Sequence, residues 1–598
     1  MKKQSGGDLR GWVLTIILSV TAQAWAVLPT NEKSDVLLST MQQELQRAQS
    51  SLGKLDPAPY FLSYSVYDQS VSNVVGSQGA LIGSTHVRRR SADVTVRIGT
   101  PALDNSHGNE RKSAIRSGVL PLEDNQDAIA HELWRLTYEE YRKASKSYVN
   151  VKTGTRVRVQ EEDPSPDFSQ EKPEAHADYT ELAPPPEQKT LEKMARQYSS
   201  YLRQYPYILS SFAIVTAQRT RLHFASSEGS HVVVPSATIR VVVEAATKAA
   251  DGMDLMRVET FQAESLEHLP PESEIARRVH KIATDLQALA NAPLAEPFDG
   301  PALLSGRAAA VFFHEVLGHR TEGHRQRGEQ EGQTFTKKVN QQVLPEFLSV
   351  TDDPTLRALN GMDLSGWYEY DNEGMPATRV EVIKDGILKN FLMSRIPIKN
   401  FGSSNGHGRA QAGLMPTGRQ GNLIVTSSRT TSDSGLRKKL IHEIKKQGKP
   451  YGLYFEDIQG GFTLTQRSLP QAFEVLPVMV WRVYADGRSD ELVRGVNIVG
   501  TPLSALSRIE ITGEKTEVFN GICGAESGAI PVAAAAPAML FSEIEVQKRA
   551  SSVSRPPTLP NPESPTSPPV SPSPSPSPVP DAPISPPAAP PEKEPDPS

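Results

Sequence analysis

Residues 311–319, with the sequence VFFHEVLGH, constrain the fold of this 598-residue chain more than any other segment. An apolar run leads directly into two imidazoles and a carboxylate, all within about one and a half helical turns. Imidazoles bind zinc, and a glutamate beside them can take a proton from bound water. The segment therefore predicts a metal site with its own general base, Glu315, on a helix for which Ser305 can provide the N-cap.

The spacing of the two histidines does not fit a regular α-helix. Side chains five residues apart differ by about 140° around a helix, whereas those four apart differ by about 40°. His314 and His319 can share one metal ion if a π-bulge adds a residue to the helix. They can also share it if the helix ends at Gly318, whose permissive backbone would turn His319 back. In a third alternative, His324 replaces one of them as a ligand.

The N-terminus has the order of a secretory signal peptide. Lys2 and Arg10 precede an apolar run over residues 12–20, and a small-residue cleavage site follows at Ala26. No later stretch approaches the roughly 20 apolar residues that span a bilayer. We expect an exported protein, periplasmic or extracellular, with no stable membrane span after cleavage. An uncleaved N-terminal anchor is the alternative.

Export makes the single cysteine, Cys523, informative. Proteins of an oxidising compartment usually use cysteines in disulfide pairs, and this one cannot form a disulfide within the chain. The thiol is a buried bystander, an intermolecular link or a metal ligand. Its coexistence with a His-Glu-x-x-x-His element favours the ligand.

Hydrophobic periodicity predicts an α+β fold, with strands and helices interleaved in an N-terminal domain over residues 27–300. An acidic, proline-rich segment over about 161–188 is predicted to be a loop. Helices are predicted at about 27–57, 126–144, 187–203 and 275–289, and strands at 60–66, 94–98, 208–218, 231–244 and 256–261.

The second half predicts the metal-site helix followed by a β-rich domain, together residues 301–550, because its pattern is mostly short strands broken by glycine. Residues 551–598 are almost entirely proline, serine, alanine and acidic residues, which cannot bury a core, so a disordered tail is expected. The net charge of -5, with lysine and arginine scattered, argues against nucleic acid as a partner.

Several ordered motifs resemble the TldD/PmbA family, also called modulators of gyrase. In chain order they are HEVLGH at 314–319 with Glu322-Gly323, Asp352-Asp353-Pro354-Thr355, Asp371-Asn372-Glu373-Gly374, Asp385-Gly386-Ile387-Leu388, Gly406-His407-Gly408-Arg409, Gly460-Gly461, Cys523-Gly524 and Pro531-Val532. They cover roughly residues 300–550, whereas the N-terminal region resembles the family only loosely. Ordered motifs over this distance are more specific than a lone His-Glu pair.

The resemblance implies a zinc-dependent peptidase with His314, His319 and Cys523 as ligands and Glu315 as the general base. Family members act on small or unfolded peptides in a chamber formed by two subunits, often a catalytic one and a paralogue that lacks the zinc motif. This chain keeps the motif, so it resembles the catalytic TldD-type subunit. The implied partner is a second copy or a TldD/PmbA paralogue.

The chain also departs from the family pattern. His324 stands where the family more often has an acidic residue, and the segment after Cys523 reads Ala525-Glu526-Ser527. Both differences affect the expected substrate contacts. Most familiar members are cytoplasmic, so the export signal argues against a gyrase-related role.

Three residues are weaker candidates for substrate binding: Arg409, His407 and His324. The segment Gly406–Arg409 would either present Arg409 to a peptide carboxylate or form a tight turn with an exposed side chain. Asp352, Asp371 and Glu373 form either a cation site or, in the ordinary interpretation, hydrogen-bonded turns.

Our first hypothesis is an exported zinc metallopeptidase that hydrolyses peptides or unfolded polypeptide segments. Three protein ligands leave a coordination position for water, whereas a closed structural site usually has four. A thiolate donates more charge than an imidazole, which predicts modest turnover. The alternatives are a zinc ion that only staples the helix to the β-rich domain, and a noncatalytic peptide-binding or assembly subunit with a vestigial zinc.

Overall fold

The computed structural model of the chain describes residues 35–108, 115–155, 163–327, 331–468, 472–549 and 559. The predicted signal peptide and, apart from residue 559, the proline-rich tail lie outside these residues. Among the helices within them, none combines the length and apolar character needed to cross a bilayer.

The N-terminal half contains a sheet of eight described strands, in the order β3-β2-β1-β6-β7-β5, with β4 beside β2 and β8 beside β7. The strands are β1 (Pro59–Ser77), β2 (Ala80–Thr100), β3 (Leu103–Asp104), β4 (Ile115–Leu120), β5 (Ala175–Ala177), β6 (Ser210–Ser226), β7 (His231–Lys248) and β8 (Asp254–Ala263). The helices are α1 (Val36–Leu52), α2 (Gln126–Thr155), α3 (Gln188–Ser200) and α4 (Glu272–Asn291). The long strands pair antiparallel, and β5 is parallel to β7.

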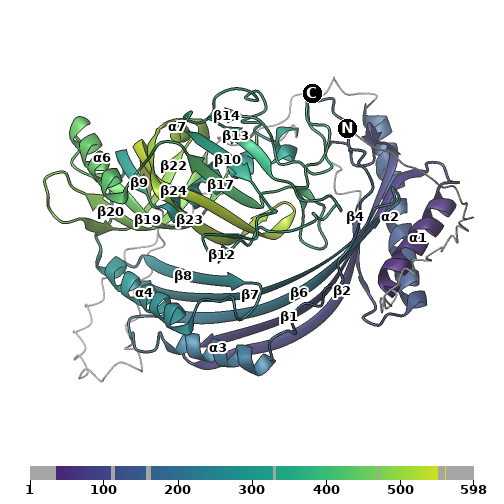
Figure 1. Ribbon diagram of the computed structural model, residues 1–598, viewed down its shortest axis with the longest axis horizontal. Coiled ribbons are helices and arrows are strands. Elements are labelled where there is room, and N and C mark those ends of the chain that lie inside the picture. Colours follow the sequence, from purple (N-terminus) through teal and green to yellow (C-terminus); the bar gives the residue numbers. More distant parts are fainter. Residues whose placement is uncertain are drawn as a thin grey trace, which may run out of the picture.

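Each of these helices packs on the sheet through an apolar face. Asp35 caps α1, because its carboxylate accepts a hydrogen bond from Leu38 N at 2.9 Å. Met41 of α1 and Leu133 of α2 are buried in one apolar cluster with residues of β1 and β2. The sheet curves beneath the second half of the chain, with α3 and α4 along its outer face (Figure 1).

The second half forms a sheet of twelve described strands. They are β9 (Phe298–Leu304), β10 (Leu348–Asp352), β13 (Val380–Lys384), β14 (Ile387–Leu388), β17 (Asn422–Ser427), β18 (Thr430–Thr431), β19 (Gly452–Thr463), β20 (Phe473–Val483), β21 (Glu491–Val493), β22 (Val496–Gly500), β23 (Ile509–Ala525) and β24 (Gly528–Lys548). Two small ladders accompany it, β11 (Ala358–Leu359) with β12 (Met362–Asp363) and β15 (Gly408–Arg409) with β16 (Thr417–Gly418). Its helices are α5 (Gly306–Val316), α6 (Asp433–Lys446) and α7 (Pro502–Ser507), and the 3₁₀ turns are η2 (Gly318–Thr321) and η3 (Gly323–Gln326).

The strand pairings of this second sheet close a ring. Strand β9 pairs with both β19 and β24, and the path from β24 through β22 and β20 returns to β19. Two segments that are about 240 residues apart in sequence, β9 and β24, are thereby held side by side. All five strands of the ring contribute to the apolar core that contains most of the second half's buried apolar side chains.

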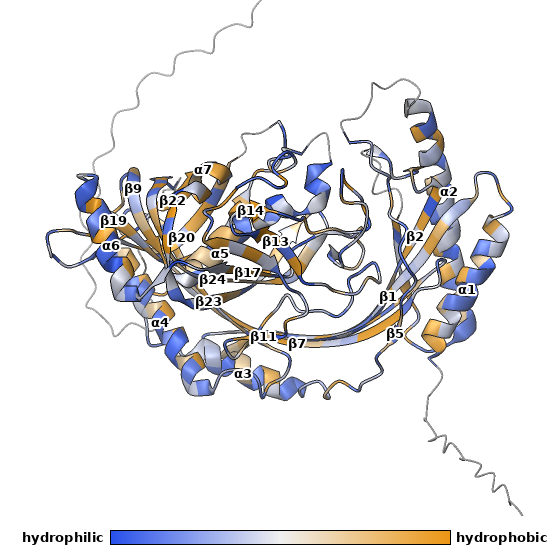
Figure 2. Cartoon of the chain, turned by 45° about the horizontal axis from the view of Figure 1, so that its top comes forward, coloured by the Kyte–Doolittle hydropathy of each residue, from blue (hydrophilic) through white to orange (hydrophobic). Residues whose placement is uncertain are grey.

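Helix α5 lies in this second core. Ser305 Oγ caps it by accepting a hydrogen bond from a backbone N–H of the first turn at 3.0 Å. Every residue of the helix except Arg307 is buried, and Phe312 packs edge-to-face on Phe473 and Phe541. A helix that is apolar all round belongs in a core, and Figure 2 shows it among hydrophobic strands.

The predicted acidic loop ties the two halves together. Its described part, from residue 163, contains β5 as its one strand, and its backbone bonds both to the first half, at Pro101 O, and to the second half, at Arg395 O. Asp163 accepts a hydrogen bond from Lys399 N at 3.0 Å, and Asp167 binds Arg327 at 2.8 Å. The segment is a loop, as predicted, but one whose carboxylates are used for packing.

Arg395 adds a second tie between the halves. Its guanidinium donates to Ser169 O at 2.7 Å and pairs with Glu228 at 2.8 Å. It also lies over the rings of Phe61 and Phe168, 5.0 and 4.0 Å from their centroids. The side chain is buried, so these contacts take the place of its hydration by water.

The α+β class predicted from the sequence is confirmed. The predicted helix at 126–144 extends further, to Thr155, and the predicted leading helix begins at Val36, within the described residues. Several strands are much longer than their periodicity indicated. The additional residues of these strands expose a polar face, which shows no apolar alternation in the sequence.

Candidate metal centre

The two histidines are brought together because α5 stops between them. The helix ends at Val316, Leu317 caps it, and His319 lies in the following 3₁₀ turn. Of the three alternatives, helix termination is therefore observed instead of a π-bulge. The rings of His314 and His319 meet with centroids 4.9 Å apart.

Gly318 contributes to this geometry in a different way from the one predicted. Its φ angle is not in the left-handed region, so a permissive backbone is not what the turn requires. A Cβ atom at this position would instead overlap the side-chain amide of Gln420. That amide also donates to His314 O at 3.3 Å. Glycine is thus needed for close approach, which lets Gln420 hold the end of the helix.

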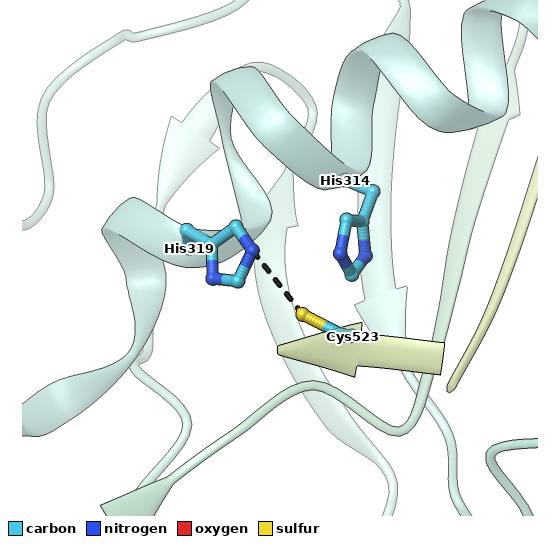
Figure 3. Close-up of side chains that lie close together, drawn as sticks. All are labelled: His314, His319 and Cys523. Atoms are coloured by element: carbon cyan, nitrogen blue, oxygen red, sulfur yellow. Dashed lines mark hydrogen bonds between the residues drawn. The ribbon is translucent and has the colours of Figure 1, made fainter. Parts of the chain in front are cut away.

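Cys523 reaches the histidines from the penultimate strand. It lies on β23, opposite Ile530 of β24, and its Sγ atom is 3.3 Å from His319 Nε2 (Figure 3). A nitrogen of each histidine and this sulfur all lie within 4.8 Å of one another. The two histidines and Cys523, which is about 200 residues away in sequence, therefore face one point.

The electrostatics of this cluster favour the thiolate. Burial would raise the pKa of the Cys523 thiol, but the imidazoles of His314 and His319 lower it to about 4. Burial would lower the pKa of His319, but Glu322 and the thiolate raise it to about 10. The pKa of His314 is also raised, against burial, by the charge of Cys523. The thiolate is the form of cysteine that binds metals.

The donor set fits zinc. Bonds of about 2.0–2.3 Å in a tetrahedron place two ligand atoms roughly 3.5 Å apart, close to the separation of His319 Nε2 and Cys523 Sγ. His314 Nδ1 is buried and has no hydrogen-bond partner among the described residues. A buried polar atom without a partner is unusual. The unpaired imidazole nitrogen therefore fits a site in which a bound group, such as a metal ion, completes the contacts.

Glu322 supports His319 from behind. Its Oε1 atom lies 3.1 Å from His319 Nδ1, so the carboxylate can orient the imidazole with Nε2 toward the cluster. The pKa of Glu322 is lowered to about 2, because the charges of His319 and Arg325 outweigh burial. The sequence analysis assigned Glu322 no role, although the residue stands within the Glu-Gly motif after His319.

Glu315 stands beside the cluster and faces a cavity. Its Oε2 atom is 3.9 Å from His319 Nε2. A Cβ atom on Gly461 would lie only 2.9 Å from Glu315 Cγ and 2.8 Å from Glu474 O, so that strand position must be small for Glu315 to adopt this place. The cavity has a volume of about 1020 Å³ and is lined by all three candidate ligands together with Glu315.

The candidate substrate-binding residues differ in their placement. His324 lines the cavity and forms an ion pair with Glu526. Arg409 is buried: it donates to Gln420 O at 2.6 Å and to Pro531 O at 2.8 Å. The exposed side chain that one sequence interpretation gave Arg409 is not observed, because those backbone carbonyls bind the buried guanidinium. Arg409 also lines a second cavity, of about 900 Å³, and its binding of a peptide carboxylate stays a prediction.

His407 is also buried rather than presented to a ligand. Its Nε2 atom lies 3.2 Å from Asp352 Oδ1, and its Nδ1 atom lies 3.0 Å from Asn405 O. Asp352 in turn accepts hydrogen bonds from Gly421 N and Asn422 N. His407 and Asp352 thus hold the loop that leads to β17 through contacts distant in sequence, so the local hydrogen-bonded turn predicted for Asp352 is not observed.

Asp371 and Glu373 form a buried carboxyl pair at a turn. Asp371 Oδ1 accepts from Glu373 N and Met375 N at 2.9 and 3.0 Å, which is the hydrogen-bonded turn that the sequence predicted. A Cβ atom on Gly408 would meet an oxygen of each carboxyl group, so both groups lie close to this glycine. Burial, and for Asp371 the charge of Glu373, raise their pKa values to about 8 and about 7.

A second group of possible ligands, Glu322, His324 and Glu526, is less suited to a cation. Arg325 Nε donates to Glu322 Oε2 at 2.8 Å, and Arg325 Nη2 donates to Glu526 Oε2 at 2.9 Å. The guanidinium already compensates both carboxylates. His324 therefore stands outside the group formed by His314, His319 and Cys523.

Part of the chain matches a known domain. Residues 299–548 match the PmbA/TldA metallopeptidase C-terminal domain. This matched region runs from β9 to the end of β24 and so includes all the residues of the cluster.

Curated proteins similar to part of this chain are named as metalloproteases. A metalloprotease of Archaeoglobus fulgidus is 27% identical over 267 residues, which are 44% of this chain and 57% of the relative. A zinc metalloprotease TldD homolog of Saccharolobus solfataricus is 25% identical over 251 residues, 41% of this chain and 51% of the relative. The chain spans about half the length of these curated relatives.

The fold extends the likeness beyond the PmbA/TldA domain. The crystal structure of TldE from Thermococcus kodakarensis superimposes with a TM-score of 0.55 at 13% identity, covering 85% of this chain and 100% of that one. The shared architecture therefore includes much of the first sheet, where the sequence resemblance was loose.

Proposed function

We propose that this chain is a zinc-dependent peptidase of the TldD type, which hydrolyses peptides or unfolded polypeptide segments. The observation that carries the proposal is the meeting of His314, His319, Cys523 and Glu315 at one end of a large cavity. The match of the PmbA/TldA domain and the names of its relatives support it.

His314, His319 and Cys523 would hold the ion. When bound, zinc supplies a Lewis acid that polarises a peptide carbonyl and makes water acidic enough to lose a proton near neutral pH. The chain provides three donors, which suits a catalytic site better than a closed structural site with four. This favours catalysis over a zinc ion that only staples α5 to the second sheet.

Glu315 would move the proton. Its carboxylate faces the cavity beside the candidate ligands, so it can accept a proton from water there and return it to the leaving amine. Gly461 and the end of α5 fix the position of its side chain. Glu322 keeps His319 in the orientation that leaves Nε2 free to bind.

The cavity limits the substrate. Its volume of about 1020 Å³ stands at the upper end of the roughly 300–1,000 Å³ of small-molecule sites. It can admit a few residues of an extended chain, but not a folded domain. This supports peptides or unfolded segments as the substrate class.

We propose two further properties that rest on the sequence. The signal-like N-terminus would direct export to the periplasm or beyond. The likeness to TldE supports a partner of the same fold, either a second copy or a TldD/PmbA paralogue.

The Glu315→Gln variant tests the mechanism. We expect about one zinc per chain in both wild type and variant, because Glu315 is not a ligand. Cleavage of a mixed peptide digest should fall at least about 100-fold, since the variant lacks a proton acceptor. Mass spectrometry of the peptides and metal analysis of the protein measure both results.

The matched control is Glu514→Gln, which removes an exposed carboxylate from the same β23 strand that carries Cys523. It should cleave like the wild type. Full activity of Glu315→Gln would contradict the mechanism. Saturable peptide binding without cleavage above a metal-stripped sample would instead indicate the noncatalytic assembly subunit.

A further inference from the structure

A buried guanidinium contacts the candidate metal-binding sulfur from outside the cluster. Arg419 lies between β16 and β17, and its side chain is completely buried. Its Nη2 atom donates to Cys523 Sγ at 3.2 Å and to Cys523 O at 3.1 Å. Its backbone N–H donates to His407 O at 3.0 Å, which fixes the origin of the side chain.

The same guanidinium reaches the second ligand indirectly. Arg419 Nε lies 3.3 Å from Glu322 Oε1, the oxygen that faces His319 Nδ1. One cation therefore contacts both the sulfur and the carboxylate that orients an imidazole. Among the described residues, it is the one arginine that donates to this sulfur.

Arg419 is also held rigidly on its other side. Its Nη1 atom donates to Ser527 Oγ at 2.8 Å and to Gly528 O at 3.2 Å, at the tip of the hairpin formed by β23 and β24. The guanidinium fork is thus directed at the sulfur by contacts on both arms of the hairpin. The planar guanidinium of arginine can donate to several acceptors in fixed directions, whereas the ammonium of lysine is a single point charge.

From these contacts we propose that Arg419 is a positioning residue that reduces the charge donated by the Cys523 sulfur to the bound metal. The inference rests on the proposed zinc site. It adds which residue sets the strength of the bound zinc ion as a Lewis acid. A charge-assisted hydrogen bond from a guanidinium holds electron density on the thiolate. The thiolate then donates less to the ion, which offsets the cost of having sulfur among the ligands.

Cobalt(II) provides the test, because its sulfur-to-metal charge-transfer band reports the donor strength of the thiolate without any peptide. Arg419→Gln removes the charge and the fork. We expect its Co²⁺-loaded form to show this band at longer wavelength than the wild type. Arg419→Lys keeps a charge without the fork, so an intermediate position is expected. Ser527→Ala frees one end of the fork and should give a smaller shift in the same direction.

Arg494→Gln is the matched control. Arg494 is buried and also contacts a sulfur, that of Met253 at 3.3 Å, but it is remote from the cluster. Its variant should leave the band in the wild-type position. A peptidase assay then adds a second readout: the acidic limb of the pH profile of kcat/KM should move to higher pH in Arg419→Lys.

The proposal is overturned if Arg419 variants lose Co²⁺ affinity while the band of the ion that remains bound does not move, because Arg419 would then only pin the hairpin. If Arg419→Gln does not fold, the band of Arg419→Lys decides by the same criterion. The absorption spectrum does not depend on cleavage, so it stays informative even if the wild type cleaves no peptide above the metal-stripped sample. An absent charge-transfer band in the wild type would contradict the sulfur ligand itself.

Discussion

Gly460 and Gly461 are adjacent in sequence but differ in their surroundings. A Cβ atom on Gly460 would meet nothing within 4 Å, whereas one on Gly461 would meet both Glu315 Cγ and Glu474 O at less than 3 Å. Neither glycine has a left-handed φ angle. The space beside Glu315, not backbone freedom, therefore explains why Gly461 must be small.

We predict that Gly461→Ala lowers peptide cleavage at least about 10-fold while zinc remains bound, because the added methyl group displaces the proposed base by a fraction of an ångström. Gly460→Ala should leave cleavage within about twofold of the wild type. The comparison requires kcat/KM and zinc content for the two variants. Equal effects of both substitutions would refute the steric argument.

The sequence predicted the members of the cluster better than their supports. His314, Glu315 and His319 stand in one short motif, and Cys523 is the chain's single cysteine, so their chemistry made them candidates and the family resemblance selected them as one set. Arg419 carries no comparable signal, because its role depends on where the loop before β17 lies in space. Gly318 was identified, but its function depends on contact with a residue about 100 positions away.

At the scale of elements, the long strands show where periodicity fails. The predicted strands at 60–66 and 94–98 are parts of β1 and β2, which span Pro59–Ser77 and Ala80–Thr100. The additional residues expose polar side chains, such as Gln69 and Arg89, to a second cavity of about 900 Å³ above the sheet. A strand with a polar inner face shows no apolar alternation, so the sequence could not reveal its length.

The turn that contains Asp371 and Glu373 predicts a pH dependence. Their pKa values in the folded protein, about 8 and about 7, exceed the ordinary values, so the folded state binds the extra protons. This stabilisation is fully present below about pH 4 and is lost as pH rises through the folded pKa values. From pH 5 to pH 9, the free energy of unfolding should therefore fall, by several kcal/mol from this pair.

Glu373→Gln should flatten that dependence. A glutamine can still accept the hydrogen bond from Arg395 N, but it has no proton to lose. Urea unfolding of wild type and variant at several pH values measures the difference. Parallel pH curves for the two proteins would show that the pair does not titrate as described.

The whole molecule depends on contacts between its two halves. Arg395 of the second half binds Ser169 O and Glu228 of the first, and it lies over two aromatic rings of that half. Breaking a buried ion pair leaves its partner without compensation, which is more costly than losing an exposed pair. This single side chain therefore couples the unfolding of the halves.

We predict that Arg395→Met lowers the free energy of unfolding by roughly 2–4 kcal/mol and broadens or splits the thermal transition. Arg437→Met is the control: Arg437 is exposed and pairs with Asp490 on the surface, so its loss should cost less than about 1 kcal/mol. Calorimetry of both variants distinguishes the outcomes. A sharp, unshifted transition in Arg395→Met would show that the halves are held together by other contacts.

The position of Cys523 on the penultimate strand has a consequence for how the protein is made. A nascent chain that has been made only through η2 contains His314 and His319 but not Cys523, and β24, which pairs with the strand of Cys523, is synthesised last among the described strands. The ring of strands likewise closes only when β24 meets β9. The three candidate ligands can therefore meet only once β24 has been made and has closed the ring.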